Sequence, residues 1–364
     1  MEKTKVILLG TGFIANIHME SYNRFVPEAQ VVAVYGRNPE KARAFARDHG
    51  IPVSYSDLDE ILEKEEAQVV DICLPNYLHH EACLKAAASG RHVIIEKPLA
   101  VSLEQADEMI RACKSRGLKL MYAEELCFAP KYERVRQMVQ AGAVGDVYML
   151  KQSEKHNGPH SPWFYNKETA GGGVMMDMGC HAMAWFRWMT GRAQAKSIYS
   201  DMKTVFHKEI TDCDDNTVTI VEFENGVTCV AEDSWAKHGG MDDRIEVYGT
   251  KGVSYADLFQ GNSALTYSVD GYGYAMEKAG DTKGWTFTIF EEEFNQGYPQ
   301  ELGHFISCVR EDKEPLVTGE DGRAVLEMIY GAYLSAKTGA KVSLPLENPP
   351  KVDYAIQILL GLRT

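Results

Sequence analysis

The fold is decided near the N-terminus by residues 5–15, which read KVILLGTGFIA. The mostly apolar run Lys5–Leu9 predicts a short strand, and the glycine-rich turn after it opens a helical pattern. Gly10 allows the tight turn, Gly12 lets an anion approach the backbone, and Ala15 keeps the helix close to the strand. Amide groups at the start of the helix would face that anion. The stretch therefore predicts a site for the pyrophosphate of a dinucleotide, with a plain glycine-rich turn as the alternative.

Short apolar runs and helical periodicity alternate through the first third of the chain. This alternation is typical of a parallel sheet covered by helices on both faces, so we expect a doubly wound α/β domain. The expected strands are Lys5–Leu9, Gln30–Tyr35, Gln68–Leu74, His92–Glu96 and Lys119–Tyr122. The expected helices are Ile14–Arg24, Pro39–Asp48, Leu58–Lys64, His79–Ala88 and Leu103–Arg116.

From about Gly145 the pattern changes to polar and apolar residues in strict alternation, which indicates antiparallel strands. Glu224-Asn225-Gly226 is a strong hairpin turn between two of them. We expect an open, mostly antiparallel sheet with a few helices, and therefore two domains, 1–124 and 125–364, the last helix and tail being able to pack back on the first. The expected elements are strands at Asp146–Gln152, Asn216–Phe223, Val227–Asp233 and Arg244–Tyr248, and helices at Met176–Met189 and Arg323–Lys337.

The composition excludes several function classes. The formal net charge of -14 argues against nucleic-acid binding and favours a neutral polar substrate. The chain shows no signal-peptide pattern and no apolar run of membrane-spanning length, so we expect no membrane partner and a cytoplasmic location. The eight cysteines are scattered, which favours reduced thiols, and the histidines lack the spacing of metal ligands, so we expect no metal.

The end of the second predicted strand bears on the choice of dinucleotide. A carboxylate is expected there to hold the ribose hydroxyls of NAD, but the stretch reads Tyr35-Gly36-Arg37-Asn38. Arg37 could accept the 2'-phosphate of NADP, or it could stack on adenine or face water. The choice between NAD and NADP therefore stays open.

Three residues could carry proton and hydride chemistry. Lys97 follows a strand at its carboxyl end, where ligands bind in open α/β sheets. Asp177 and His181 are four residues apart, which would place both on one face of the helix after the run Gly171–Gly173. A histidine can take the hydroxyl proton as an alcohol is oxidised, and a lysine can stabilise the developing alkoxide. Taken singly, the three are more often a solvated strand end, a helix cap and a core histidine, and it is their occurrence together with the dinucleotide loop that favours a catalytic role.

These motifs together resemble the Gfo/Idh/MocA family of oxidoreductases over nearly the whole chain. The matching stretches are Gly10–Ala15, Pro75–His79, Gly90–Ala100, Gly171–Gly173 with Asp177 and His181, Gly249–Gly252 and Thr338–Val342. The resemblance implies an N-terminal Rossmann domain, a C-terminal α/β domain whose sheet commonly forms the oligomer interface, and hence a homo-oligomer, either a dimer or a tetramer. By similarity, Lys97 would contact substrate and nicotinamide ribose, Asp177 would hold the reacting hydroxyl region, and His181 would be the general acid or base.

The same resemblance implies a cofactor site lined by Gly10, Gly12, Phe13, Ile14, Arg37, Pro75, Asn76, His79, Glu96 and Lys97. The chain departs from the family at two places. Ala184 stands where many relatives carry an acid three residues after the histidine. Glu125 and Cys127 stand where an amide and an arginine are common, and we hypothesise that Glu125 contacts a substrate hydroxyl.

The segment from Lys155 to Tyr165 is the best candidate for the substrate pocket. It mixes hydrogen-bonding and aromatic side chains as sugar sites do, although a surface loop with aromatic anchors is the alternative. The candidate substrate-binding residues are Glu125, His156, Asn157, His160, Trp163 and Tyr165, with Trp235, His238 and Tyr298 as further candidates. We expect hydride transfer between NAD(P) and a secondary hydroxyl of a sugar, glycoside or inositol. The alternatives are an NAD-dependent glycosidase that oxidises C3 transiently and eliminates, and a non-catalytic cofactor-binding sensor.

Overall fold

The computed structural model describes residues 2–259, 264–271, 278, 281–288 and 291–361. The chain forms two compact units, and each is described by itself. The first unit consists of Met1–Phe128 and Gly297–Leu326, and the second of Ala129–Gln296 and Glu327–Thr364. Gly297–Leu326 thus groups with the N-terminal unit, although the sequence analysis assigned it to the second domain.

The first unit contains a parallel sheet of the predicted doubly wound type. Its strand order is β3-β2-β1-β4-β5-β6, and every neighbouring pair is parallel. Strands covered on both faces read as continuous apolar runs, and β4 is buried at each of its positions. The strands are β1 Thr4–Leu9, β2 Ala29–Tyr35, β3 Val53–Tyr55, β4 Val69–Ile72, β5 His92–Glu96 and β6 Leu120–Ala123.

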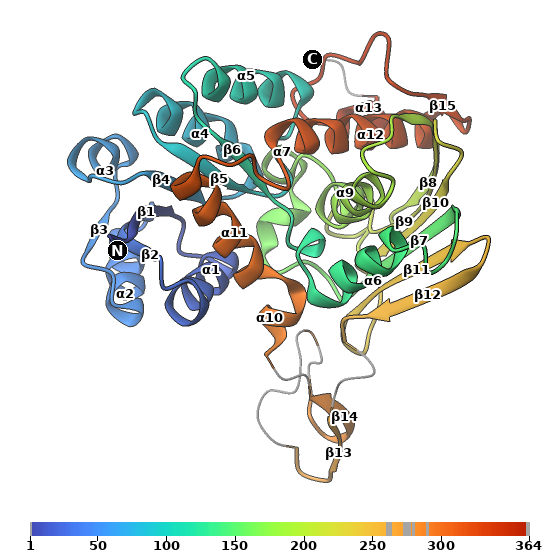
Figure 1. The fold of residues 1–364 in the computed structure, drawn as a ribbon, viewed down its shortest axis with the longest axis horizontal. Coiled ribbons are helices and arrows are strands. Elements are labelled where there is room, and N and C mark those ends of the chain that lie inside the picture. Colours follow the sequence, from blue (N-terminus) through green and yellow to red (C-terminus); the bar gives the residue numbers. More distant parts are fainter. Residues whose placement is uncertain (1, 260–263, 272–277, 279–280, 289–290, 362–364) are drawn as a thin grey trace. The chain divides into compact units, whose positions relative to one another are not determined.

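Helices lie on both faces of this sheet, with α1 and α2 on one side and α4 and α5 on the other (Figure 1). The ends of α2 have local causes, because Asn38 caps the helix, Pro39 begins it and Gly50 closes it with φ +70°. The helix α11 packs against α1 and was not predicted. The helices of this unit are α1 Phe13–Phe25, α2 Pro39–His49, α3 Leu58–Lys64, α4 His79–Ala88, α5 Leu103–Lys114 and α11 Tyr298–Glu311, with short turns η1 Asn76–Leu78 and η2 Glu125–Cys127.

The second unit contains a mixed sheet in the order β12-β11-β7-β10-β9-β8-β15. All neighbouring pairs are antiparallel except β7 with β10, which confirms the prediction of a mostly antiparallel sheet. A separate hairpin pairs β13 with β14. The strands are β7 Val147–Lys155, β8 Ala195–Lys203, β9 Asn216–Phe223, β10 Thr228–Ser234, β11 Asp242–Gly249, β12 Gly252–Asp257, β13 Ala264–Ser268, β14 Gly284–Thr288 and β15 Val342–Ser343.

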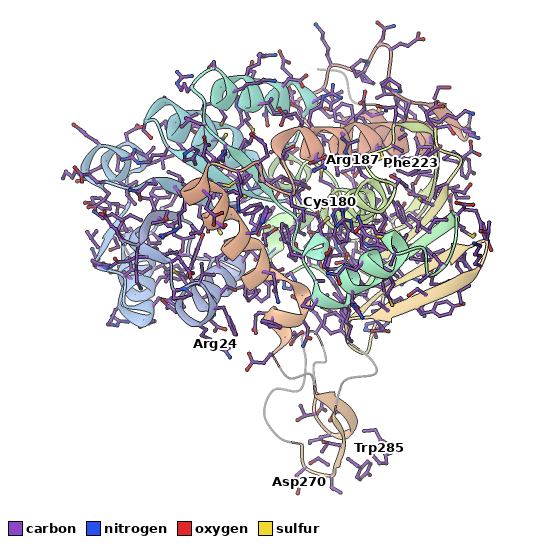
Figure 2. All side chains as sticks on the ribbon, in the orientation of Figure 1. Arg24, Cys180, Arg187, Phe223, Asp270 and Trp285 are labelled. Carbon is purple, nitrogen blue, oxygen red and sulfur yellow. The ribbon has the colours of Figure 1, made fainter. Side chains whose placement is uncertain are left out.

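Helices cover one face of the mixed sheet, and α9 packs on β7 and β10. On β9 the buried and exposed residues alternate, so Phe223 is buried while Val218 and Ile220 are exposed. Figure 2 shows all side chains on the ribbon, including buried Cys180 and exposed Trp285. No helix among the described residues is long and apolar enough to cross a bilayer. The helices are α6 Pro130–Gln140, α7 Lys167–Ala170, α8 Val174–Asp177, α9 Gly179–Met189, α10 Glu292–Gln296 and α13 Gln357–Leu360, with the turn η3 Pro162–Tyr165, while α12 Gly319–Thr338 runs through both units.

Candidate active site

The glycine-rich turn after β1 has the geometry that a dinucleotide needs. Gly10 has φ +129°, and a Cβ there would lie 2.2 Å from the carbonyl oxygen of Cys73, so only glycine fits. Gly12 is exposed, has open space where a Cβ would be, and begins α1 with no side-chain cap and no acidic residue in the first turn. An uncapped, exposed helix N-terminus presents amide hydrogens to an anion. The residues present therefore fit a bound pyrophosphate.

Arg37 follows β2 and is exposed, as the sequence analysis expected. Its Nη1 donates to the hydroxyl of Tyr77 at 3.1 Å, which joins the loops after β2 and β4. The neighbouring Asn38 is engaged as the cap of α2. No carboxylate stands among these residues, so NAD and NADP both remain open.

His79 holds two loops together at the same edge of the sheet. Its Nε2 lies 2.8 Å from the carbonyl oxygen of Leu74, and its Nδ1 lies 3.0 Å from that of Pro98. The side chain is fully buried, and this burial lowers its pKa. His79 thus connects the loop after β4 with the loop that carries Lys97, a supporting role that the sequence did not reveal. Its contact with the cofactor, like those of Pro75 and Asn76, stays a prediction.

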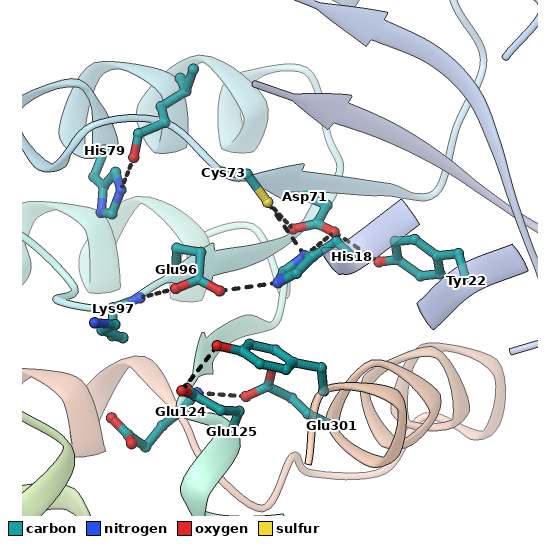
Figure 3. A network of polar contacts seen from close by, with 12 residues as sticks. His18, Tyr22, Asp71, Cys73, His79, Glu96, Lys97, Glu124, Glu125 and Glu301 are labelled. Carbon is teal, nitrogen blue, oxygen red and sulfur yellow. Dashed lines mark hydrogen bonds and ion pairs between the residues drawn. The ribbon is translucent and has the colours of Figure 1, made fainter. Parts of the chain in front are cut away.

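Lys97 is reached through a chain of polar contacts that begins on α1 (Figure 3). The backbone N–H of Lys97 donates to Glu96 Oε2 at 3.1 Å, and Glu96 Oε1 lies 3.0 Å from His18 Nε2. The other ring nitrogen of His18 lies 2.9 Å from Asp71 Oδ2, which also accepts from the Tyr22 hydroxyl. His18 and Asp71 were not predicted from the sequence. The available signal was an acid inside the otherwise apolar strand β4.

Several further acids lie beside Lys97 in the first unit (Figure 3). The backbone N–H of Glu124 donates to Glu301 Oε1 at 2.5 Å, and the Tyr298 hydroxyl donates to Glu125 Oε1 at 3.2 Å. Burial raises the pKa of Glu124 to about 8, with Glu96 adding to the shift and Lys97 opposing it. Glu124 is therefore mostly protonated at neutral pH. Glu125 is engaged by Tyr298, and its contact with a substrate hydroxyl stays a prediction.

Asp177 and His181 lie in the second unit on two helices rather than one. The helix predicted at Met176–Met189 is interrupted at Met178, so Asp177 ends α8 and His181 belongs to α9. The expectation of one continuous helix is therefore wrong, while a shared orientation of the two side chains stays a prediction. Asp177 is oriented by another element, because Trp235 Nε1 donates to its Oδ2 at 3.0 Å.

The glycine run before α8 is held by Asp214, which the sequence analysis did not identify. Asp214 Oδ1 accepts from the backbone N–H of Gly173 and from the hydroxyl of Tyr333, and Oδ2 accepts from the N–H of Met175 at 2.8 Å. A Cβ on Gly173 would lie 2.0 Å from the Asp214 carbonyl oxygen. The glycine is thus required for this close approach, which sets the position of α8.

The candidate substrate segment is only partly exposed. His156 is buried, whereas Asn157 and His160 are exposed, and the rings of His156 and His160 are 5.7 Å apart. Trp163 stacks on Phe164 at 3.8 Å. Tyr165 meets the ring of Trp235 edge-on at 6.0 Å. Phe164 and Tyr165 both pack against the buried cluster of Val174, Met178 and Trp235. This segment therefore adjoins the tryptophan that orients Asp177. His238 lies against Phe206.

Metal ligation was not expected from the sequence. The donor atoms of His18, Asp71 and Cys73 lie within 4.8 Å of one another, but these groups already hydrogen-bond among themselves. The absence of a metal thus stays a prediction, as does the convergence of Lys97 with Asp177 and His181, which belong to different units.

Comparison with known proteins identifies both halves of the chain. Residues 4–124 match the model of the oxidoreductase family with an NAD-binding Rossmann fold, and residues 132–254 match the GFO/IDH/MocA C-terminal domain.

Individual relatives match nearly the whole chain. Myo-inositol 2-dehydrogenase of Thermotoga maritima is 26% identical over 93% of this chain and 98% of its own. D-glucoside 3-dehydrogenase of Escherichia coli is 26% identical over 93% and 97%. The crystal structure of GenD2 from gentamicin A biosynthesis, in complex with NAD, has 29% identity, a TM-score of 0.90, and coverage of 95% of this chain and 97% of that one. The chain belongs to the Gfo/Idh/MocA family of oxidoreductases, which confirms the resemblance found in its sequence motifs.

Proposed function

We propose that this chain is an NAD(P)-dependent dehydrogenase that transfers a hydride between the nicotinamide cofactor and a secondary hydroxyl of a sugar, glycoside or inositol. The observation that carries the proposal is the exposed glycine cradle at the start of α1, on the same sheet edge as Lys97. Relatives that match nearly the whole chain are named as dehydrogenases of an inositol and of a glucoside.

We assign the roles of the site as follows. The nicotinamide ring, when bound, supplies the acceptor or donor of the hydride. His181 takes the proton of the reacting hydroxyl, or returns it in the reverse direction. The Lys97 ammonium stabilises the developing alkoxide, and Asp177, fixed by Trp235, orients the hydroxyl region of the substrate.

The aromatic segment beside Trp235 suits a carbohydrate. Sugar rings present apolar faces to aromatic side chains and hydroxyls to polar ones, and Trp163, Tyr165, His156, Asn157 and His160 supply both kinds of group. The net charge of -14 favours a neutral substrate over a polyanion. Substrate contacts by these residues and by Glu125 are part of the proposal. The redox-neutral glycosidase is not favoured, because the relatives are named as dehydrogenases.

A panel of sugars, glycosides and cyclitols, monitored at the absorbance of the reduced nicotinamide, tests the proposal. We expect turnover of at least one compound, and a loss of kcat of about 10²- to 10⁴-fold in His181→Asn. Lys97→Met should lose activity to a similar extent, whereas Lys114→Met on the exposed surface of α5 should not. Absence of turnover with cofactor bound would overturn the proposal, and release of an aglycone without reduced cofactor would replace it with the glycosidase.

NAD and NADP affinities measured by titration decide whether Arg37 discriminates between them. We expect a homo-oligomer, because an open sheet face with exposed apolar residues such as Val218 and Ile220 needs covering, and light scattering measures this. We also expect a cytoplasmic location, which fractionation of cells tests.

A further inference from the structure

A buried histidine occupies the space between two acids on neighbouring strands of the first unit. His18 of α1 is fully buried, with Nδ1 2.9 Å from Asp71 Oδ2 and Nε2 3.0 Å from Glu96 Oε1. Asp71 lies in β4 and Glu96 ends β5 (Figure 3). One side chain thus bridges the two strands at the edge where the cofactor loops begin.

The two contacts define the protons that the ring must carry. A neutral imidazole has one N–H donor and one acceptor nitrogen, whereas an imidazolium donates from both. Both nitrogens of His18 face carboxyl oxygens, so with both acids ionised only the doubly protonated ring satisfies the two contacts together. Burial, the largest single influence, lowers the pKa of His18, but the charges and hydrogen bonds of Asp71 and Cys73 together raise that pKa well above its ordinary value.

Other titratable groups around His18 come from several elements. The Cys73 thiol, after β4, lies 3.3 Å from Nδ1, and the Tyr22 hydroxyl of α1 donates to Asp71 at 2.9 Å. On α11, the ring of Tyr298 lies 6.3 Å from that of His18, and Glu301 interacts electrostatically with it. Acids and weak acids therefore surround the histidine within this unit.

Glu96, which contacts His18, also contacts the backbone of Lys97 in the proposed site. Glu96 uses Oε1 for His18 and Oε2 for the backbone N–H of Lys97, at 3.1 Å. A carboxylate held at both oxygens cannot rotate without breaking one of these bonds. The orientation of Glu96 thus fixes the backbone from which the Lys97 side chain projects.

We propose that His18, by donating from both ring nitrogens to Asp71 and Glu96, is a positioning residue for Lys97. The inference rests on the role of Lys97 in the proposed function. His18 is buried and reaches the reacting groups only through Glu96. The same helix begins at the glycine cradle. In this proposal the N-terminus of α1 binds the cofactor, and His18 of α1 positions Lys97. Loosening a supporting contact of this kind costs rate more than affinity, because small errors of position weaken catalysis steeply.

His18→Gln in the full-length protein tests the inference, with Tyr22→Phe as the matched control. Glutamine keeps a polar side chain but has one donor nitrogen and no charge, so it cannot donate to both acids from separate nitrogens. Tyr22→Phe removes a donor to the same Asp71 without touching Glu96. We expect His18→Gln to lower kcat about 10- to 100-fold and to change the dissociation constant of the cofactor less than about threefold. Tyr22→Phe should lower Tm by about 2–4 °C and leave kcat within about twofold.

Two further measurements make each outcome decisive. In the wild-type chain, nitrogen NMR of the labelled histidine ring should show both nitrogens protonated at about pH 8. A neutral ring there would overturn the inference, even if His18→Gln fails to fold. Lys97→Met is assayed in parallel. If it keeps full turnover, the role of Lys97 in the proposed function fails. If it loses turnover while a folded His18→Gln does not, only the positioning role fails.

Discussion

Two groups of buried acids, one in each unit, show different ways of placing a carboxyl group away from water. In the first unit, Asp71 accepts from the His18 ring and the Tyr22 hydroxyl. In the second, Asp233 of β10 lies beside Glu154 of β7 in the sheet, and Glu154 lies beside Asp243 of β11. Neither oxygen of Asp233 has a hydrogen-bond partner among the described residues, and burial raises its pKa well above its ordinary value. We infer that the first acid is stabilised by a cationic partner and that the raised pKa of the second favours its protonated form, because an unpaired buried charge costs more than a neutral carboxyl group.

The largest effect should come from neutralising the paired acid. Asp71→Asn leaves the buried His18 ring beside an amide instead of an anion, and breaking a buried ion pair in this way costs about 3–5 kcal/mol of unfolding free energy. Urea unfolding of the wild type and the variant at neutral pH measures the difference. A loss below about 1 kcal/mol would mean that the pairing contributes little, and the contrast between the two units would disappear.

A second acid of the second unit, Asp177, extends the comparison because it does have a donor. Trp235→Phe removes the N–H that Asp177 accepts, and a hydrogen bond to a charged group contributes about 1.5–3 kcal/mol. Trp185→Phe is the matched control, since Trp185 is also fully buried and its Nε1 has no partner among the described residues. We expect Trp235→Phe to lose more unfolding free energy than the control, by about that amount, when both are unfolded in urea. We also expect Trp235→Phe to raise the KM for substrate. Equal losses in the two variants would show that only ring volume matters.

Glu124 offers a test of protonation inside the first unit. Its pKa is raised to about 8 by burial, against an ordinary value of 4.5. Between about pH 4.5 and pH 8 the folded state keeps a proton that the unfolded state releases, so its contribution to stability is full below this window and is lost as the pH rises through it. In the wild type the unfolding free energy should fall with pH in this window by up to about 1.4 kcal/mol per pH unit, and we expect Glu124→Gln to remove this dependence. Unfolding at several pH values measures the slope, and Glu63→Gln on the exposed side of α3 should leave it unchanged.

The regular elements of both sheets were largely predictable because their signals are local. Continuous apolar runs marked β4 and β5, strict alternation marked β9, and helical periodicity marked α2. The helices α6 and α11 were missed, and the break at Met178 could not be read from the spacing of Asp177 and His181. Helix spacing is a property of neighbouring residues, whereas the break accompanies contacts of the glycine run with Asp214, far along the chain.

The residues of the candidate site also fall into those that local sequence signals predicted and those that depend on distant contacts. The glycine cradle and Lys97 were found because each belongs to a short motif in a recognisable context. His18, Asp71 and Trp235 act through partners that are many residues distant, as the contact of Trp235 with Asp177 shows. An acid in an apolar strand looks the same in sequence whether a histidine pairs with it, as with Asp71, or a proton neutralises it, as with Asp233. Tertiary packing decides which of the two applies.

Asp233→Asn should cause the smallest loss of unfolding free energy and is the counterpart of Asp71→Asn. The protonated carboxyl group and the amide are both neutral and similar in shape. At about pH 4, near the ordinary pKa of an aspartate, the unfolding free energy should therefore change by less than about 1 kcal/mol. The pKa of Asp233 is raised, so the wild type loses stability as the pH rises above the ordinary value of 3.8, while the asparagine variant does not. The unfolding free energy of the variant should therefore rise relative to that of the wild type as the pH increases above that value, by up to about 1.4 kcal/mol per pH unit. A loss comparable to that of Asp71→Asn would instead show that Asp233 is ionised and paired, and that both units bury their acids by the same means.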